Sequence, residues 1–179
     1  MTEVCSLDIM SSLRCSVQGC APLSSLDSLK VTLTGIAGRI VSPYSLQEWS
    51  LRRPEQLSFS IPASEALVCK DPDWRVTLLG RLQRDVKGVR AQAIITLSSK
   101  GSPVDFLKAL GYVVEKERKR EGFVAESMEQ FHTYLYKEED MLRVEVVSEC
   151  QQENLDMHLE RLYAYALLLS PAVSFERGS

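Results

Sequence analysis

Residues 102 to 112 read SPVDFLKALGY, and this stretch carries the clearest local pattern in the chain. Ser102 can cap a helix, because its side-chain oxygen can accept a hydrogen bond from a free N–H of the first turn. Pro103 suits the first helical position, where a backbone N–H would have no partner. Gly111 can end the helix in a left-handed conformation. The stretch therefore predicts a short helix over residues 103–110.

Strand patterns lie on both sides of this helix. Residues 74–79 and 89–97 both show a period of two, and the polar link between them contains Gly88, so they predict an antiparallel hairpin. After the helix, three segments rich in β-branched and aromatic residues predict a meander of strands. These segments are residues 112–124, 130–137 and 141–149.

Amphipathic helices are predicted near both ends of the chain, where apolar residues recur at spacings of three and four. The first stripe is Leu26, Leu29, Leu33 and Ile36, followed by Gly38, and the second is Leu155, Leu159, Leu162, Ala166 and Leu169, followed by Pro171. After the first helix, prolines punctuate segments 44–52 and 56–61, which favours edge strands. Residues 65–73 are expected to form a loop, because Asp71, Pro72 and Asp73 supply turn chemistry.

The order of these elements predicts the fold class. Helix, several strands, helix, three strands and helix do not follow the βα alternation of a parallel sheet. A chain of 179 residues is also near the size of one ordinary domain. We therefore expect a single α+β domain over residues 1–179, with an antiparallel sheet that is curved or closed into a barrel and flanked by helices.

The bulk composition narrows the classes of function. A net charge of −3 and a pI near 5.5 lack the basic footprint of nucleic-acid binding proteins, so direct DNA binding is not expected. The five cysteines are odd in number and irregularly spaced, which favours free thiols in a reducing compartment. No run of 18 apolar residues occurs, so a membrane span is not expected either.

The sequence contains few of the motifs that are typical of catalytic or cofactor-binding sites. The glycines match neither a phosphate-binding loop nor a dinucleotide fingerprint. His132 and His158 fall in different predicted elements, and each is expected to be structural or exposed. We therefore expect no catalytic residue, no metal and no cofactor.

The end of the final predicted helix is apolar on more than one side. Leu167 and Leu168 project away from the main stripe when 100° is allotted to each residue. Either both sides are buried within the chain's own domain, or one side docks against another protein. Leu167 and Leu168 are the candidate protein-binding residues.

A charged strand offers the one candidate site for chemistry. Glu115, Glu117 and Lys119 would share one face of an extended strand, and such a set can hold a divalent metal and a phosphate oxygen. Glu145 with Glu149 is the close candidate for a second carboxylate pair. Further phosphate partners would be Arg75, Arg90 and Arg143. The alternative is a solvated edge strand whose charges resist pairing with other chains.

Read in order, several short motifs resemble one known family. They are SLDSLKVTLTGIAG (residues 25–38), WRVTLLG (74–80), VR (89–90), DFLKALGY (105–112) and EGFVAES (121–127). Their order is similar to that in the family of Mediator head subunit eighteen, and it covers nearly the whole chain. This chain differs from longer family members by a short link over residues 148–154.

The resemblance implies a nuclear, non-catalytic interaction subunit in the regulation of transcription. Its expected partners are Mediator subunit twenty in a heterodimer, the C-terminal helix of subunit eight, and RNA polymerase II through the head module. It also implies structural roles: a core strand for Trp74 and Leu79, the helix stop for Gly111, and the buried helix side for Phe106, Leu107 and Leu110. The family shares its barrel with the triphosphate-tunnel enzymes, so a metal-dependent triphosphatase remains the alternative.

Overall fold

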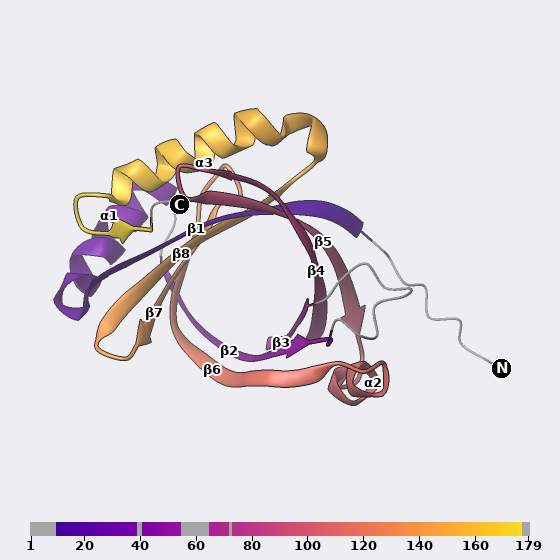
Figure 1. Cartoon of the computed structure of the whole chain (residues 1–179). Coiled ribbons are helices and arrows are strands. Elements are labelled where there is room, and N and C mark those ends of the chain that lie inside the picture. Colours follow the sequence, from indigo (N-terminus) through magenta and orange to yellow (C-terminus); the bar gives the residue numbers. More distant parts are fainter. Residues whose placement is uncertain (1–9, 39–40, 55–64, 72, 177–179) are drawn as a thin grey trace. The chain divides into compact units, whose positions relative to one another are not determined.

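A computed structural model of the chain describes residues 10–38, 41–54, 65–71 and 73–176 (Figure 1). The strands are β1 (Met10–Pro22), β2 (Ser42–Arg52), β3 (Glu65–Asp71), β4 (Asp73–Val86), β5 (Val89–Ser99), β6 (Val113–Glu126), β7 (His132–Glu138), β8 (Met141–Cys150) and β9 (Ser174–Phe175). The helices are α1 (Leu26–Ala37), α2 (Val104–Ala109) and α3 (Leu155–Leu169), and short 3-10 turns at Leu23–Ser25 and Gln152–Asn154 precede α1 and α3.

The sheet has the strand order β5-β4-β3-β2-β6-β7-β8-β1-β9, and β5 also pairs with β1. The pairing order therefore closes on itself, which confirms the predicted α+β class with an antiparallel, barrel-like sheet and flanking helices. Internal contacts divide the chain into two compact units, which are described separately. One contains residues 46–81 and 93–119 with the N-terminal segment to residue 12, and the other contains residues 13–45, 82–92 and 120–179.

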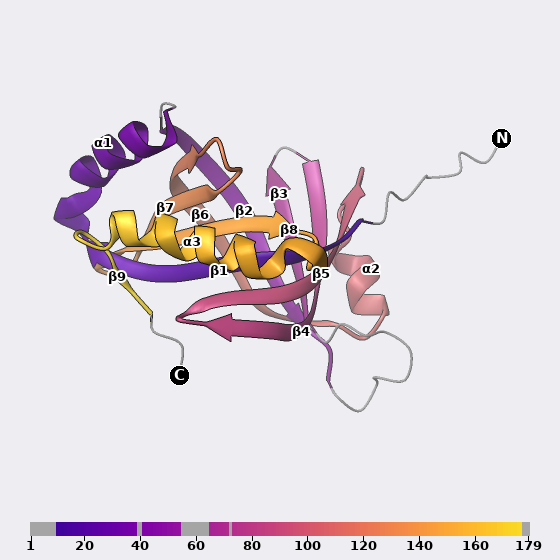
Figure 2. The ribbon, with the colours of Figure 1, turned by 90° about the horizontal axis from the view of Figure 1, so that it is seen from above.

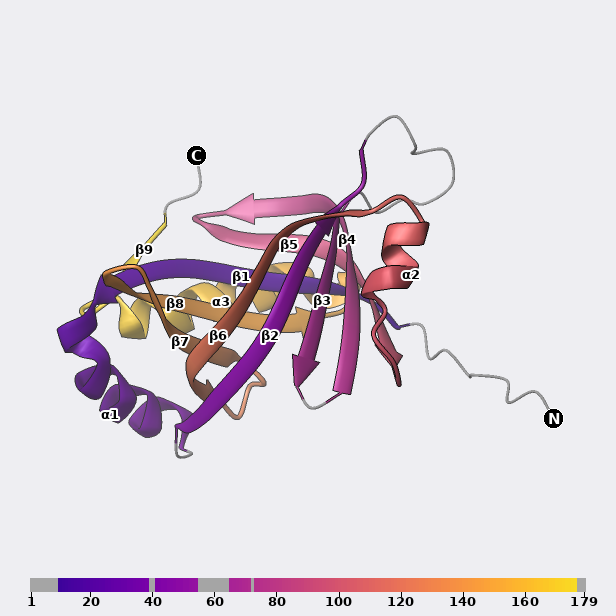
Figure 3. The same cartoon turned by 90° about the horizontal axis from the view of Figure 1, so that it is seen from below.

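The core of the first unit lies between its strands and α2 (Figure 3). Its buried members are Leu51, Ala66, Val68, Val76, Val104, Leu107 and Tyr112. The rings of Trp49 and Trp74 pack against this cluster, with their centroids 5.2 Å apart. Trp74, which begins the motif WRVTLLG, therefore belongs to the core as predicted.

Helix α2 corrects the expectation drawn from SPVDFLKALGY. The helix begins at Val104 with Pro103 as its N-cap, one residue later than predicted, and the Ser102 cap does not form. Leu107 is buried, but Phe106 is 66% exposed and Leu110 is 38% exposed. A helix of six residues presents only one narrow stripe to the sheet, so the expected burial of Phe106 and Leu110 is wrong.

Gly111 ends α2 as predicted. Its φ is 90°, a conformation that side chains disfavour, and its N–H donates to the carbonyl of Lys108 at 2.9 Å. The N–H of Tyr112 then donates to the carbonyl of Leu107 at 3.0 Å. Tyr112 follows into the core of the first unit, so the turn sets where β6 begins.

Two expectations in the first unit need correction. Residues 65–71 form β3 rather than a loop, because Ala66 and Val68 alternate into the core and the turn chemistry lies at the end of the strand. The segment 44–52 is a strand, but β2 lies between β3 and β6 and is no edge. Its Pro43 lies near the first residue, where a missing N–H is tolerated. The predicted strand 56–61 lies outside the described residues.

The predicted meander β6-β7-β8 is formed and is extended by β1, and the second unit contains its part from residue 120 onward. β1 was not predicted, although Leu13, Cys15, Val17 and Ala21 alternate into the core. β1 and β8 pair antiparallel with Cys15 opposite Ser148, and β9 adds two residues beside Gly19 and Cys20. Gly122 on β6 comes so close to the carbonyl oxygen of Leu135 that a Cβ would clash with it.

Helices α1 and α3 both belong to the second unit, and α3 lies along β1 and β8 (Figures 1 and 2). The whole predicted stripe of α3 is buried, namely Leu155, Leu159, Leu162, Ala166 and Leu169. α1 buries Leu29 and Leu33 and ends at Gly38, whose φ is 65°, as predicted. No helix within the described residues is long and apolar enough to cross a membrane.

Candidate functional site

Three large apolar side chains of α3 are exposed and are here called the α3 strip: Met157 in the first turn, and Leu167 and Leu168 at the C-terminal end of the helix. These side chains are 51%, 48% and 56% exposed, while the neighbouring Leu169 is 1% exposed. The first of the two alternatives, that the chain itself buries both sides of the helix end, does not hold for the described residues. Their exposure leaves the docking interpretation of the sequence in place.

Contacts from the sheet and from the β4-β5 hairpin tip fix α3 in the second unit. The Tyr165 hydroxyl lies 3.1 Å from Thr133 Oγ1 on β7. Arg84 near the hairpin tip pairs with Asp156 in the first turn of α3, and the ammonium group of Lys87 lies 4.8 Å from the ring centroid of Tyr163. The α3 strip thus belongs to a helix that is held along its length.

The opposite face of the second unit's sheet is polar. Glu145 on β8 is 4% exposed, and its two carboxylate oxygens contact different arginines. Arg14 Nη2 lies 3.2 Å from Oε1, and Arg120 Nη1 lies 2.9 Å from Oε2. Sequence reasoning missed this cluster because three strands bring it together. Glu145 is thereby engaged by two cations, which makes it a poor metal ligand.

Aromatic rings surround the same cluster. The guanidinium carbon of Arg120 lies 4.7 Å from the ring centroid of Tyr136, and the rings of Tyr44 and Tyr134 meet edge to face at 5.3 Å. Burial raises the pKa of Tyr136 to about 12, although the charge of Arg120 works in the opposite direction. Burial also raises the pKa of Tyr44 above its ordinary value.

The candidate triphosphate residues lie in the first unit, on β6. Glu115, Glu117 and Lys119 are all exposed. Glu115 Oε1 lies 3.8 Å from Arg52 Nη1, and Gln47 Nε2 donates to Glu117 Oε1 at 3.1 Å. Exposed carboxylates that already contact other side chains agree with the solvated-strand alternative.

Arg118, the next residue along β6, contacts a buried carboxylate. Arg118 Nε donates to Glu48 Oε1 at 2.5 Å, and Glu48 is 2% exposed. This buried carboxylate on β2 therefore has a cation beside it, and the charged strand contributes an ion pair to its own unit. No signal in the sequence singled out Glu48, since its pairing depends on the order of β2 and β6.

The three arginines suggested as phosphate partners have different surroundings. Arg75 is exposed on β4. Arg90 Nε lies 3.5 Å from Asp85 Oδ2. Arg143 reaches Glu138 and Glu176 at 2.9 Å each, and its hydrogen bond to Glu138 raises the pKa of the guanidinium. Arg90 and Arg143 therefore already face carboxylates within the second unit.

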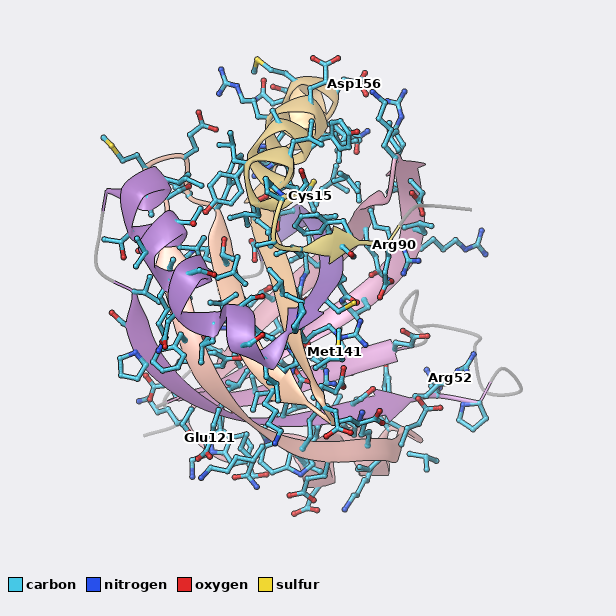
Figure 4. The ribbon with its side chains drawn as sticks, turned by 90° about the vertical axis from the view of Figure 1, so that its left-hand side faces the viewer. Cys15, Arg52, Arg90, Glu121, Met141 and Asp156 are labelled. Atoms are coloured by element: carbon cyan, nitrogen blue, oxygen red, sulfur yellow. The ribbon has the colours of Figure 1, made fainter. Side chains whose placement is uncertain are left out.

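A different group of side chains lies beneath α3. Sγ of Cys15 is 3.7 Å from Sγ of Cys150, and His158 on α3 completes a set whose ligand atoms lie within 4.8 Å of one another. The His158 Nε2 atom is 2.7 Å from Ser148 Oγ. Figure 4 shows Cys15 on the side of β1 that faces α3. His132, in contrast, is half-buried and stacks on Tyr134.

The environment of this cluster keeps its groups uncharged. Burial, helped by Cys150, raises the pKa of the Cys15 thiol to about 12. Burial also raises the pKa of Cys150. Burial and then the charge of Arg161 lower the pKa of His158. Sequence reasoning missed the cluster because Cys15 and Cys150 are distant along the chain and meet only through the β1-β8 register.

No protein-family model matches the chain, and no curated protein matches its sequence. Among solved structures, a chain of the Mediator head module of Schizosaccharomyces pombe superimposes with a TM-score of 0.67 at 16% identity, over 93% of this chain and 100% of that one. The chain has the fold of a Mediator head subunit. This agrees with the family resemblance of the sequence, for which the motifs WRVTLLG and DFLKALGY are the strongest evidence.

Structures outside Mediator share the same fold. A protein of Pyrococcus horikoshii OT3 superimposes with a TM-score of 0.64 at 11% identity, over 93% of this chain and 94% of that one. A Hippeastrum protein described as having a dominant triphosphatase activity gives a TM-score of 0.56 at 11% identity, over 93% of this chain and 91% of that one. The fold therefore agrees with both hypotheses, and the decision between them depends on particular side chains.

Proposed function

We propose that the chain is a non-catalytic subunit of the nuclear Mediator head module. In this role it bridges other Mediator subunits and RNA polymerase II in the regulation of transcription. The superposition on the whole of a Mediator head chain is the observation that carries the proposal. The ordered motifs of the sequence, chiefly WRVTLLG and DFLKALGY, support it as a separate line of evidence.

The proposed partners are subunit twenty, in a heterodimer, and the C-terminal helix of subunit eight. We assign the α3 strip to one of these protein contacts. Large apolar side chains on a fixed helix are typical anchors of an interface, because burying them removes apolar surface from water. Leu168 is the most exposed of the three, which makes it the first position to test.

Coexpression with subunits twenty and eight tests the proposal. A complex that elutes together from a size-exclusion column, and that needs the C-terminal segment of subunit eight for its full mass, is the expected result. Elution of the chain alone, after it has been shown to be folded, would contradict the assignment of these partners.

A metal-dependent triphosphatase is the second candidate, favoured by the Hippeastrum protein and by the arginines around Glu145. Two observations weigh against it. Glu115 and Glu117 are exposed and contact Arg52 and Gln47, and Glu145 is occupied by Arg14 and Arg120. A metal ion would have to displace these partners, whereas a catalytic carboxylate pair keeps coordination positions open.

A further inference from the structure

Three side chains from separate segments converge beneath α3. Cys15 comes from β1, Cys150 is the last residue of β8, and His158 lies in the second turn of α3. Their ligand atoms lie within 4.8 Å of one another. Cys15 is fully buried, and the other two are half-buried. An ion bound among them would be partly shielded from water and reachable from one side.

The spacing of the two sulfurs fits a particular coordination geometry. A tetrahedral zinc ion with Zn–S bonds of about 2.3 Å places two thiolate sulfurs about 3.7 to 3.8 Å apart. The observed separation between Sγ of Cys15 and Sγ of Cys150 is 3.7 Å. Two protonated thiols in a hydrogen bond can also lie at this distance. The sulfurs therefore need little movement between a proton-bound and a zinc-bound arrangement.

The register of the strands accounts for this spacing. Cys150 lies opposite Leu13, and Cys15 lies opposite Ser148, so the cysteines are diagonal neighbours on one face of the sheet. α3 starts soon after β8, at Leu155, so the short link returns His158 to the end of the same strand. The short link between β8 and α3 thus helps to form the cluster.

The histidine also has the outer partners that a ligand needs. A metal-bound imidazole usually hydrogen-bonds through its second ring nitrogen, which fixes the ring. Ser148 Oγ lies 2.7 Å from Nε2 of His158. In the tautomer that carries its proton on Nε2, Ser148 accepts that N–H and Nδ1 is the nitrogen offered to an ion. The ring of Phe131 meets His158 edge to face at 5.6 Å. The imidazole is held on two sides.

We propose that Cys15, Cys150 and His158 form a binding site for one zinc ion, with water in the fourth position. Zinc replaces the proton of each thiol, so binding releases two protons to solvent and leaves two thiolates and a neutral imidazole on the metal. The bound ion links β1, β8 and α3, and therefore stabilises the helix that carries the α3 strip. This proposal does not depend on the Mediator assignment.

A disulfide between Cys15 and Cys150 is the competing outcome. It would need a two-electron oxidant, which the chain itself does not supply. It would also leave His158 without a part in the cluster. The convergence of the imidazole on both sulfurs is the feature that favours a metal ion.

Cobalt, which takes the same tetrahedral geometry, is the spectroscopic probe. The full-length chain is reduced, freed of metal with a chelator, and titrated with Co²⁺ and then with Zn²⁺. We expect a thiolate-to-cobalt charge-transfer band that saturates at about one ion per chain and disappears when zinc displaces cobalt. Zinc should also raise the melting temperature as its free concentration exceeds the dissociation constant.

Variants separate this site from adventitious binding. Cys150→Ala and His158→Gln should each weaken zinc binding at least about tenfold, since removing an outer-shell partner alone can cost that much. The matched controls Cys20→Ala, on the same strand as Cys15, and Cys69→Ala, in the first unit, should bind as the wild type does. Cys15 is fully buried, so Cys150→Ala decides the result if Cys15→Ala does not fold.

Two outcomes overturn the proposal. One is the absence of a thiolate-to-cobalt band in the wild type, or a band of unchanged strength in Cys150→Ala. The other is the loss of two free thiols under mild oxidation, abolished in Cys150→Ala, in a protein whose reduced form gives no cobalt band. The second result would show a disulfide pair in place of a zinc site.

Discussion

Arg120 and Glu145 join β6 to β8 through a contact of 2.9 Å between Nη1 and Oε2, with side chains that are 12% and 5% exposed. Breaking such a buried pair leaves a charge without compensation, which costs about 3 to 5 kcal/mol when burial is complete. Arg14, the second partner, also loses its counter-charge, but it is 24% exposed and water solvates part of its charge. We expect Glu145→Gln to lower the free energy of unfolding by about 2 to 4 kcal/mol, measured by urea denaturation.

The control for this prediction is Glu160→Gln on the exposed side of α3. Surface changes of this kind stay within about 0.5 kcal/mol. Equal stabilities for Glu145→Gln and Glu160→Gln would show that the cluster of Arg14, Arg120 and Glu145 contributes nothing to the fold.

Alanine substitutions at Gly122 and Gly35 are expected to change the stability of the fold in opposite directions. A Cβ at Gly122 would clash with the carbonyl oxygen of Leu135 on the adjacent strand, whereas nothing lies within 4 Å of a Cβ at Gly35 in α1. Overpacking costs about 1 to 3 kcal/mol, and replacing glycine inside an exposed helix contributes about 0.5 to 1 kcal/mol. Thermal melts should show Gly122→Ala below and Gly35→Ala above the wild type.

Alkaline pH should destabilise the protein through Tyr136. Its pKa in the folded chain is about 12, against an ordinary value of 10. Between these values the unfolded chain loses the phenol proton while the folded chain keeps it, so stability falls as pH rises through this window. Urea denaturation at pH 9 and pH 11 should show a smaller fall for Tyr136→Phe than for the wild type. An identical fall in both proteins would mean that Tyr136 is not buried as described.

Substitutions at two adjacent leucines of α3 test the α3 strip and the buried core separately. Leu168 is 56% exposed and Leu169 is 1% exposed. We expect Leu168→Asp to keep the wild-type melting temperature within a few degrees and to lose binding to its Mediator partner. Leu169→Asp should unfold, because a buried carboxylate without a partner is strongly destabilising. If Leu168→Asp binds as well as the wild type, the α3 strip is not the interface.

The triphosphatase alternative has a direct assay. Phosphate release from tripolyphosphate with Mg²⁺ or Mn²⁺ should not exceed the rate measured without protein, and Glu117→Gln should leave that result unchanged. Release by the wild type that falls in both Glu117→Gln and Glu145→Gln would instead support an enzyme.

Local periodicity was enough to predict some elements of this fold. The stripes of α1 and α3 and the strands β4 and β5 follow from the spacing of apolar residues. The strands β6 to β8 follow from their β-branched and aromatic content, and the stop at Gly111 follows from the backbone freedom of glycine. β1 was missed because its inward side chains include the small residues Cys15 and Ala21, which do not stand out as a hydrophobic pattern. β3 was missed because the turn residues at its end dominated the interpretation.

The candidate sites depended on information that the sequence does not display. Glu145 meets Arg14 and Arg120, and Cys15 meets Cys150, only through strand order and register. The exposure of Phe106 likewise follows from the shortness of α2 and from what the sheet leaves uncovered. Leu167 and Leu168 were found because an apolar residue off the main stripe of a helix is visible in the sequence itself.

Affinity purification of the tagged chain from its native cells, followed by mass spectrometry, is the most direct test of the proposed function. We expect the other subunits of the Mediator head module to be recovered with the wild type and to be depleted with Leu168→Asp when the two proteins are expressed at equal levels. Recovery of the folded wild-type chain without any Mediator head subunit would show that the chain is not a subunit of this module.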